Sequence, residues 1–278
     1  MFFNNKEECM KYFRASLVLL IICVFVNACS LREQNVFSKS SLATIEKRGT
    51  LLVGTTGDYR PLTYREPNSD MYWGFDLEVA QKIAERLGVS LTYVQTSWPT
   101  LTKDVLDRTR FDLAIGGITI TQVRKEKMDM SEGYLVNGKT ILCRKKEIKK
   151  YQNLAAINKP SVRVMVNPGG LNEKFARDKL PHATIIVYPK NEEIPAQIAA
   201  GKADVMITEI TEAPYYVERD TRLAAPLLTQ PFTHGEIDVL MRRGQTDLLE
   251  VVNTVIQEMK NDGSLRKLHE KYHLNYGY

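Results

Sequence analysis

Residues 75–94 read FDLEVAQKIAERLGVSLTYV, a helix pattern followed by a strand pattern. Apolar residues recur at helical spacing, at Leu77, Val79, Ala80, Ile83, Ala84 and Leu87. The helix is expected to stop at Gly88, and Ser90–Val94 reads as the next strand. Repeated alternation of strands and helices with short loops predicts a parallel sheet covered by helices.

The same alternation extends in both directions. In a first lobe it gives helix Ser41–Arg48, strand Leu51–Val53, helix Leu101–Asp107 and strand Asp112–Ile115. It restarts with strand Ser161–Val166, helix Asn172–Lys179, strand Thr184–Tyr188, helix Ile194–Ala200 and strand Ala203–Ile207. The tail Ile237–Met241 and the helix Asp247–Met259 return to the first lobe, with crossings near Lys139–Cys143 and Gln230–His234. We therefore predict an α/β fold of two lobes with a double hinge, lobe 1 being residues 36–140 plus 231–278 and lobe 2 residues 141–230.

The N-terminus has the features of a secretory signal. Lys11 and Arg14 precede an apolar run over residues 15–26, which closes on Asn27-Ala28-Cys29 and is too short to span a bilayer. Cys29 directly after Ala28 resembles a bacterial lipobox, in which the cysteine is lipidated. Two outcomes stay open for segment 1–29: a lipid anchor on Cys29, or cleavage near Ala28 that releases the protein. Both place the mature chain in the periplasm.

Cysteine count and charge exclude several classes of protein. Cys9 and Cys23 leave with the signal and a lipid would occupy Cys29, so Cys143 alone remains and a lipidated chain has no intramolecular disulfide. The 38 basic and 33 acidic residues give a net charge of +5, spread without a basic stripe. We therefore expect no nucleic-acid partner, and a weakly positive cleft that favours a small anion. No metal or P-loop motif appears, so we expect no metal and no cofactor.

Four segments have the composition of loops that follow strands and hold a small anion: residues 55–59, 119–124, 167–175 and 209–212. Ligands of open α/β sheets bind outside the carboxyl ends of the strands. All four segments occupy that edge of the predicted sheets. We therefore expect them to converge on one cleft between the lobes.

Cationic and glycine-rich groups in these loops favour carboxylates. Arg124, with Thr119 before it, presents a guanidinium fork at the start of a helix. Gly169-Gly170 opens the first helix of the second lobe, where bare amides can approach an anion, and Lys139 lies at the crossover. Alone, each group has a plainer interpretation: a capped helix with a solvated arginine, a simple turn, an exposed lysine. Together they predict two carboxylates bound at two places.

Two glutamates supply an acid that a simple binder of anions does not need. Glu209 and Glu212 follow the strand ending at Ile207 and are expected to share one face of a helix. Two carboxyls close together in a desolvated cleft cannot both ionise easily, so one pKa rises, and a protonated glutamic acid is a general acid. The alternative is a solvated glutamate pair. Asp58-Tyr59 and Trp98 lie at the rim, where an aromatic ring stacks on a flat ligand or fills the core.

From roughly Ser41 to the C-terminus the chain resembles the type II periplasmic amino-acid-binding proteins, the solute receptors of bacterial importers. The matching motifs are GFD at 74–76, GITIT at 117–121 with Arg124, and GKAD at 201–204. The resemblance implies the two-lobed fold. It also implies that Thr119 and Arg124 hold a ligand carboxylate, and that an acidic residue near position 209 holds an ammonium group.

A narrower resemblance is to the exported cyclohexadienyl dehydratases, which have this fold and convert prephenate to phenylpyruvate and arogenate to phenylalanine. It rests on TTGDY at 55–59, TSWP at 96–99, NGKT at 137–140, VNPGG at 166–170 with NEKFAR at 172–177, and QPF at 230–232. It implies that Glu212 is the general acid and that the pocket includes Asp58, Trp98, Lys139 and Asn167. The family pattern has an aspartate where this chain has Glu209.

Two functions from different classes follow. The first is an exported carbon–oxygen lyase, a prephenate or arogenate dehydratase acting by general acid catalysis. Its catalytic residues would be Glu212, Lys139 and Asn167, and its binding residues Asp58, Tyr59, Trp98, Thr119, Arg124, Gly169, Gly170 and Glu209. The second is a non-catalytic receptor of an amino-acid importer that uses Glu209 for the ligand's ammonium. The preference between prephenate and arogenate and the oligomeric state stay open.

Overall fold

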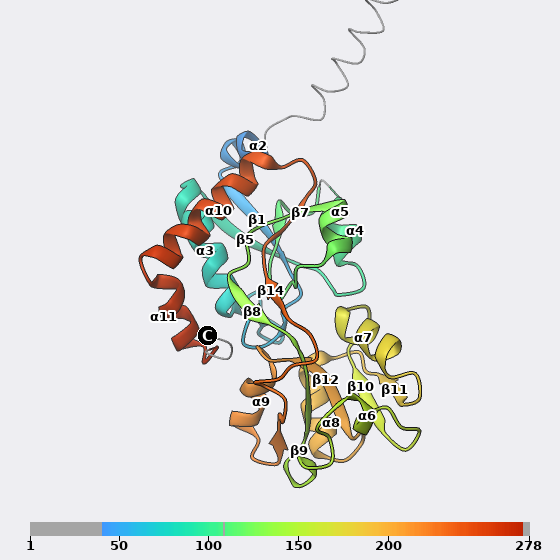
Figure 1. Ribbon diagram of the computed structural model, residues 1–278. Coiled ribbons are helices and arrows are strands. Elements are labelled where there is room, and N and C mark those ends of the chain that lie inside the picture. The colour runs from blue at the N-terminus through green and yellow to red at the C-terminus, as the bar shows by residue number, and fades with distance from the viewer. Residues whose placement is uncertain (1–40, 108, 275–278) are drawn as a thin grey trace, which may run out of the picture.

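A computed structural model describes residues 41–107 and 109–274 of the chain. It has two lobes, each built on a five-stranded sheet, and the connections between them run through the middle of the molecule (Figure 1). The predicted signal segment 1–29, with Cys29, lies outside the described residues. In the part of the chain that is described, no helix is long and apolar enough to cross a membrane.

The sheet of lobe 1 has the strand order β5-β1-β6-β15-β7. These strands are β1 (Thr50–Thr55), β5 (Ser90–Gln95), β6 (Leu113–Ala114), β7 (Met128–Met130) and β15 (Leu240–Arg242). β1 pairs in parallel with β5 and β6, whereas β15 runs antiparallel to β6 and β7. The prediction of a parallel sheet is therefore wrong at β15, the strand that the C-terminal tail adds, and at its neighbour β7. The helices of this lobe are α2 (Ser41–Arg48), α3 (Phe75–Leu87), α4 (Leu101–Leu106), α5 (Gln122–Lys127), α10 (Thr246–Asn261) and α11 (Ser264–Lys271).

Helix α3 has both of its predicted ends and positions one loop of the cleft. It stops at Gly88, whose left-handed φ of 65° lets its amide reach Glu85 and Ala84 carbonyls. Its apolar face is buried against the sheet. Asp76, in its first turn, is fully buried and accepts a 2.5 Å hydrogen bond from the amide of Gly117. This bond holds the loop that leads from β6 to Thr119.

The sheet of lobe 2 has the strand order β11-β10-β12-β9-β13. Its strands are β9 (Lys139–Arg144), β10 (Arg163–Val166), β11 (Thr184–Val187), β12 (Val205–Glu209) and β13 (Leu223–Ala224). β10 is parallel to β11 and β12, and β9 is antiparallel to β12 and β13. The helices are α6 (Leu154–Ile157), α7 (Leu171–Lys179), α8 (Ile194–Ala199) and α9 (Ala213–Arg219), with short 3₁₀ turns η1 (Lys145–Glu147) and η2 (Asn191–Glu193).

The two crossings between the lobes lie side by side. β8 (Leu135–Asn137) pairs with β14 (Gly235–Ile237), and just beyond them the Lys139 amide donates to Thr233 Oγ1 at 2.9 Å. The first crossing thus lies at Gly138, earlier than the predicted Lys139–Cys143, because that segment forms β9 of the second sheet. A Cβ added at Gly138 would lie 2.1 Å from the Thr233 carbonyl oxygen. The closeness of the two chains therefore requires glycine here.

A small three-stranded sheet was not predicted from the sequence. It consists of β2 (Asp58–Tyr59), β3 (Thr63–Arg65) and β4 (Tyr72–Trp73), all antiparallel. Strands of two or three residues are too short to show a hydrophobic period. This sheet matters because it carries Asp58 and Tyr59 to the edge that faces lobe 2.

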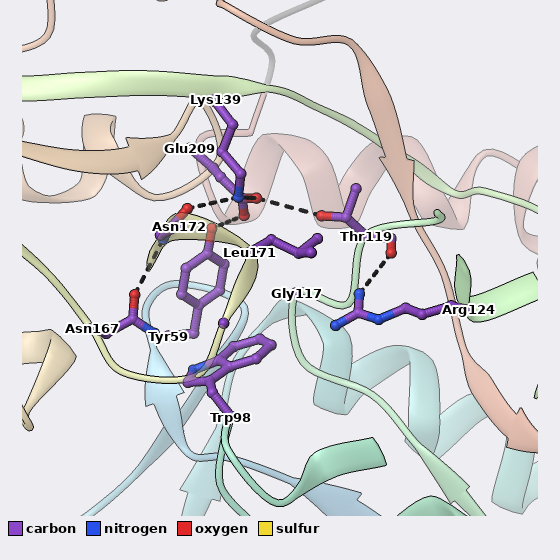
Figure 2. A pocket seen from close by; sticks show the side chains of 11 residues that line it. Tyr59, Trp98, Gly117, Thr119, Arg124, Lys139, Asn167, Leu171, Asn172 and Glu209 are labelled. Atoms are coloured by element: carbon purple, nitrogen blue, oxygen red, sulfur yellow. Dashed lines mark hydrogen bonds and ion pairs between the residues drawn. The ribbon is translucent and has the colours of Figure 1, made fainter. Parts of the chain in front are cut away.

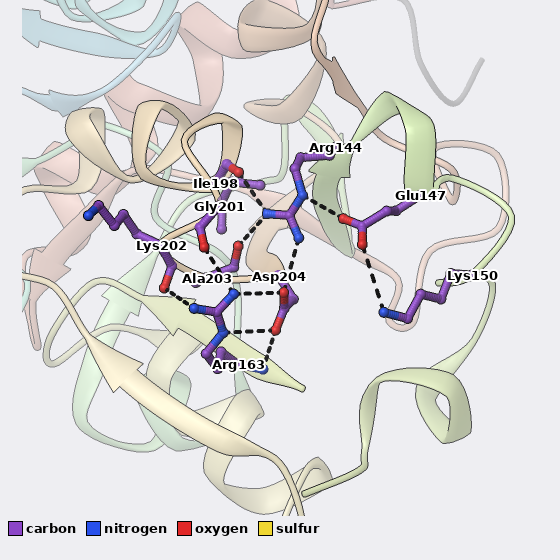
Figure 3. A network of polar contacts seen from close by, with 9 residues as sticks. All are labelled: Arg144, Glu147, Lys150, Arg163, Ile198, Gly201, Lys202, Ala203 and Asp204. Atoms are coloured by element: carbon purple, nitrogen blue, oxygen red, sulfur yellow. Dashed lines mark hydrogen bonds and ion pairs between the residues drawn. The ribbon is translucent and has the colours of Figure 1, made fainter. Parts of the chain in front are cut away.

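An ionic network ties the strands of lobe 2 together around Asp204 (Figure 3). Its carboxylate accepts from the Arg163 amide at 2.9 Å and from the Arg144 guanidinium at 3.0 Å. Arg144 also donates to the carbonyls of Ile198 and Ala203, at 2.9 and 2.6 Å. Burial tends to raise the pKa of Asp204, but the bonds from both arginines outweigh it and lower the pKa to about 2. The network therefore stabilises β9 and β10 only while Asp204 is charged.

We expect Asp204→Asn to lower the free energy of unfolding by about 2–4 kcal/mol at pH 7, because two arginines lose their carboxylate. The folded pKa lies below the unfolded value of about 3.9, so this stabilisation is present above pH 4 and is lost as the pH falls towards 2. Urea unfolding across this range measures both effects. Asp178→Asn, which removes an exposed pair with Lys174, is the control and should change stability by less than about 0.5 kcal/mol.

Candidate functional site

The carboxyl ends of the strands of both lobes meet around one small pocket (Figure 2). It is lined by Tyr59, Trp98, Gly117, Thr119, Arg124, Lys139, Asn167, Gly170, Leu171, Asn172 and Glu209. The four predicted loops therefore do converge. The pocket encloses about 20 Å³, roughly the space of one water molecule. The lobes are thus closed on each other, and a ring-bearing ligand can enter only when they part.

A buried ion pair between Lys139 and Glu209 forms part of the lining of the pocket. Their side chains are 8% and 5% exposed, and the Lys139 ammonium contacts Glu209 Oε1. The same ammonium donates to Asn172 Oδ1 at 2.6 Å, and the Tyr59 hydroxyl donates to the other Glu209 oxygen. Burial tends to raise the pKa of Glu209, but the Lys139 charge and these hydrogen bonds outweigh it, so the pKa lies below its ordinary value. Glu209 is therefore an anion held by a cation.

Arg124 lies on the opposite wall, in the first turn of α5. Its Nη1 donates to the Thr119 carbonyl at 2.7 Å, and Thr121 caps the helix by accepting from the Arg124 amide at 3.2 Å. The plainer interpretation of a fully solvated arginine is wrong, because the side chain is half-buried and lines the pocket. With Lys139 and Arg124 against Glu209, the lining carries one net positive charge. Such a pocket favours an anionic ligand.

Glu212 lies beside this pocket but does not line it. The side chain is fully buried, with Oε1 accepting from Asn191 Nδ2 at 2.6 Å and Oε2 within 2.5 Å of the Thr208 hydroxyl. Burial raises the pKa of Glu212 to about 8, with a smaller contribution from the carboxyls of Glu209 and Asp58. Glu212 is therefore largely protonated at neutral pH.

The expectation that Glu209 and Glu212 share a helix face is wrong. Glu209 is the last residue of β12, Glu212 precedes α9, and a turn joins them through a 3.0 Å bond from the Glu212 amide to the Glu209 carbonyl. The cause of the raised pKa also differs from the prediction, since burial contributes more than repulsion between the two carboxyls. The predicted result, one charged and one protonated glutamate, is nevertheless present.

The two glycines before α7 do not both offer free amides. The Gly169 amide donates to the Glu173 carboxylate at 2.7 Å, an arrangement that a helix N-terminus favours. Gly169 is also packed against lobe 1, since a Cβ there would lie 2.6 Å from Pro99 Cα. Only Gly170 lines the pocket. An anion bound here would meet Gly170, not Gly169.

Asp58 and Trp98 form part of the lobe 1 wall. The Trp98 indole donates to Asp58 Oδ1 at 3.0 Å, and its ring meets Tyr59 edge to face, with 5.8 Å between centroids. Burial raises the pKa of Asp58. Trp98 and Tyr59 line the pocket whereas Asp58 does not, so Asp58 orients the ring that a ligand would touch.

Three polar residues at the site were not predicted as functional: Asn172, Asn191 and Thr208. Asn172 bridges Lys139 and Asn167, to whose Oδ1 it donates at 3.3 Å. It lies inside the NEKFAR motif, so the sequence did carry a signal for it. Asn191 and Thr208 hold Glu212 and lie outside the motifs quoted above.

Comparisons with known proteins agree with this architecture. Residues 51–275 match the model of the bacterial extracellular solute-binding proteins, family 3. The chain is 41% identical to a cyclohexadienyl dehydratase of Pseudomonas aeruginosa, over 84% of this chain and 85% of that protein.

Two solved structures of ancestral proteins are also similar. One is the ancestral amino acid-binding protein AncCDT-1, a precursor of cyclohexadienyl dehydratase, with 36% identity, a TM-score of 0.77, and coverage of 84% of this chain and 99% of that chain. The other is an ancestral cyclohexadienyl dehydratase, with 48% identity, a TM-score of 0.52, and coverage of 84% and 97%. The chain belongs to family 3 of the bacterial extracellular solute-binding proteins.

Proposed function

We propose that this protein is a cyclohexadienyl dehydratase, a carbon–oxygen lyase that converts prephenate to phenylpyruvate, arogenate to phenylalanine, or both. The observation that carries the proposal is Glu212, a fully buried carboxyl whose pKa of about 8 keeps it protonated beside an anion-binding cleft. A receptor needs no such acid. The 41% identity to a cyclohexadienyl dehydratase supports the same assignment.

The charges of the pocket suit a substrate with two carboxylates. Arg124 on the lobe 1 wall is the partner we assign to one of them, by paired N–H donors. The Gly170 amide, on the lobe 2 side, is assigned to the other, with Lys139 assisting beside its ion pair with Glu209. Asn167 and Asn172 supply neutral donors around the ring. We assign no substrate group to the Gly169 amide, since Glu173 occupies it.

The reaction needs one acid and no redox partner. Glu212 gives its proton to the ring hydroxyl, the carbon–oxygen bond breaks, and water leaves. The bond from the ring to its carboxylate then supplies the electron pair that makes the ring aromatic, and carbon dioxide departs. Glu212 ends as a carboxylate and recovers a proton from solvent. General acid catalysis supplies about 10²–10⁴-fold, and closed lobes add orientation and exclude water.

An amino-acid receptor is the second candidate, because Glu209 lines the pocket as an anion and one similar structure is an amino acid-binding protein. In that case Glu209 would hold the ligand's ammonium. The Lys139 ammonium already neutralises Glu209, which disfavours a cationic ligand. An amino acid released from the purified protein on denaturation, found by mass spectrometry, would support the receptor.

We further propose that the protein acts in the periplasm, with a small anionic molecule as its ligand and no nucleic-acid partner. The membership of an extracellular solute-binding family supports export. For the N-terminus we keep the two outcomes set by Ala28-Cys29, a lipid on Cys29 or simple cleavage. The mass of the mature N-terminal peptide distinguishes them.

Glu212→Gln should reduce turnover of prephenate and arogenate by about 10²–10⁴-fold, because the amide keeps the shape of the acid but has no proton to give. Phenylpyruvate formation is followed by its absorbance in alkali, and binding of phenylpyruvate by calorimetry should persist. Glu218→Gln, on the exposed side of α9, the helix that follows Glu212, should keep full activity. Retention of most activity in Glu212→Gln would rule out this acid.

The value of kcat/KM should fall as the pH rises through about 8, because the free enzyme then loses the Glu212 proton. The reaction rate is measured from pH 6 to pH 10 at low substrate concentration. A rate that increases over this range would contradict a protonated Glu212 as the acid.

Arg124→Ala should weaken binding of a carboxylate substrate by about 10- to 100-fold, the usual cost of a lost charged hydrogen bond. The comparison is of KM and of calorimetric affinity for phenylpyruvate. Lys125→Ala removes the exposed neighbouring cation and should leave both unchanged. Equal affinities for the Arg124→Ala and unsubstituted proteins would contradict the assigned role of this cleft.

A further inference from the structure

Asn191 connects the buried acid to the opposite lobe. It begins η2, between β11 and α8 of lobe 2, and its side chain is fully buried. Its Nδ2 donates to Glu212 Oε1 at 2.6 Å and to the backbone carbonyl of Asp58 at 3.0 Å. Glu212 belongs to lobe 2, and Asp58 belongs to the small sheet of lobe 1. One nitrogen therefore bonds an acceptor in each lobe.

The two hydrogens of Asn191 Nδ2 match its two acceptors, Glu212 Oε1 and the Asp58 carbonyl. A side-chain amide has two N–H groups, and here each has one acceptor. The bond to Asp58 exists only while the lobes are closed, because it spans the gap between them. The amide is thus held by both lobes in the closed protein, whereas in an open one only its bond to Glu212, within lobe 2, would remain to orient it.

We propose that Asn191 is a positioning residue that makes the orientation of the Glu212 carboxyl depend on closure of the lobes. This inference rests on the proposed role of Glu212 as the general acid. It goes beyond that role by naming the group that prepares the acid and the movement that engages it.

The hydrogen bonds determine which oxygen of Glu212 carries the proton. Oε1 accepts from Asn191, so in the neutral acid the hydrogen belongs on Oε2 and is donated to the Thr208 hydroxyl, the reverse of the bond that Thr208 donates to the charged carboxylate. Among the bonds of the described residues, Asn191 gives Oε1 its donor. Without it a buried oxygen would lack a partner, and the carboxyl could rotate.

The groups around Glu212 indicate in which direction the loss of Asn191 would shift its pKa. Facing it are the carboxyls of Asp58 and Glu209 and the phenols of Tyr59 and Tyr216. None of these four neighbours is a cation. The hydrogen bonds from Thr208 and Asn191 are the interactions that lower the pKa of Glu212. Removing Asn191 should therefore raise the pKa of Glu212 further while reducing the rate.

Asn191→Ala tests the proposal with four readouts. We expect kcat to fall at least 10-fold, the alkaline limb of the kcat/KM profile to move to higher pH, and calorimetric affinity for phenylpyruvate to fall by a smaller factor than kcat, because fewer molecules are closed. Small-angle scattering should show a larger radius of gyration, because the closed lobes lose a bond. Asn191→Asp, which keeps the volume but replaces the donor by an acceptor, should show the same changes if the alanine variant does not fold.

The control is Asn158→Ala, which removes a lobe 2 amide that holds the His182 backbone at 2.8 Å. It should lower stability without moving the pH profile.

An infrared titration of the Glu212 carboxyl, assigned with Glu212→Gln, reports the pKa without turnover. An unchanged infrared midpoint in both Asn191 variants would overturn the proposal. Absence of turnover in the unsubstituted protein would instead overturn the proposed function, and the infrared midpoint would still decide whether Asn191 controls Glu212.

Discussion

The buried pair of Lys139 and Glu209 is the constraint around which the cleft is arranged. β9 and β12 pair antiparallel in a register that places Lys139, the first residue after the crossing, opposite Glu209, the last residue of its strand. Neither charge is tolerable alone at this depth, since removing one partner of a buried pair leaves an uncompensated ion. Tyr59 of lobe 1 and Asn172 of α7 both bond to this pair. The hinge, the sheet edge and the helix of lobe 2 are therefore fixed by one interaction.

Two glutamates three residues apart have opposite titration behaviour because their neighbours differ. Glu209 meets an ammonium group, and its pKa is lowered. Glu212 is as deeply buried but meets a hydroxyl and an amide, neither of which carries charge, and its pKa rises to about 8. Environments that separate the pKa values of neighbouring carboxyls are a general mark of acid catalysis. Here the two pKa values differ because the turn after β12 places Glu209 against Lys139 and Glu212 against Thr208 and Asn191.

Much of this could be predicted from the sequence, because long periodic segments dominate the fold. α3 was predicted with both ends, and the order of strands and helices in each lobe followed from the same alternation. The small sheet carrying Tyr59 was missed, since its strands are too short to show a period. The role of Asn191 was missed because its partner lies 21 residues later, beyond any local pattern. The bond from the Gly169 amide to the Glu173 carboxylate was also not predicted, because the sequence does not show which backbone amides a side chain already occupies.

The glycine at the first crossing limits how the two lobes can move. A side chain at Gly138 would clash with the Thr233 carbonyl of the second crossing, so the two connecting chains lie close together only because this residue is glycine. Because the two connections are paired side by side, we expect the lobes to move by rotation about them. One angle then governs both admission of the ligand and assembly of the residues around the acid. A substitution at the hinge is therefore expected to change the rate and the affinity together.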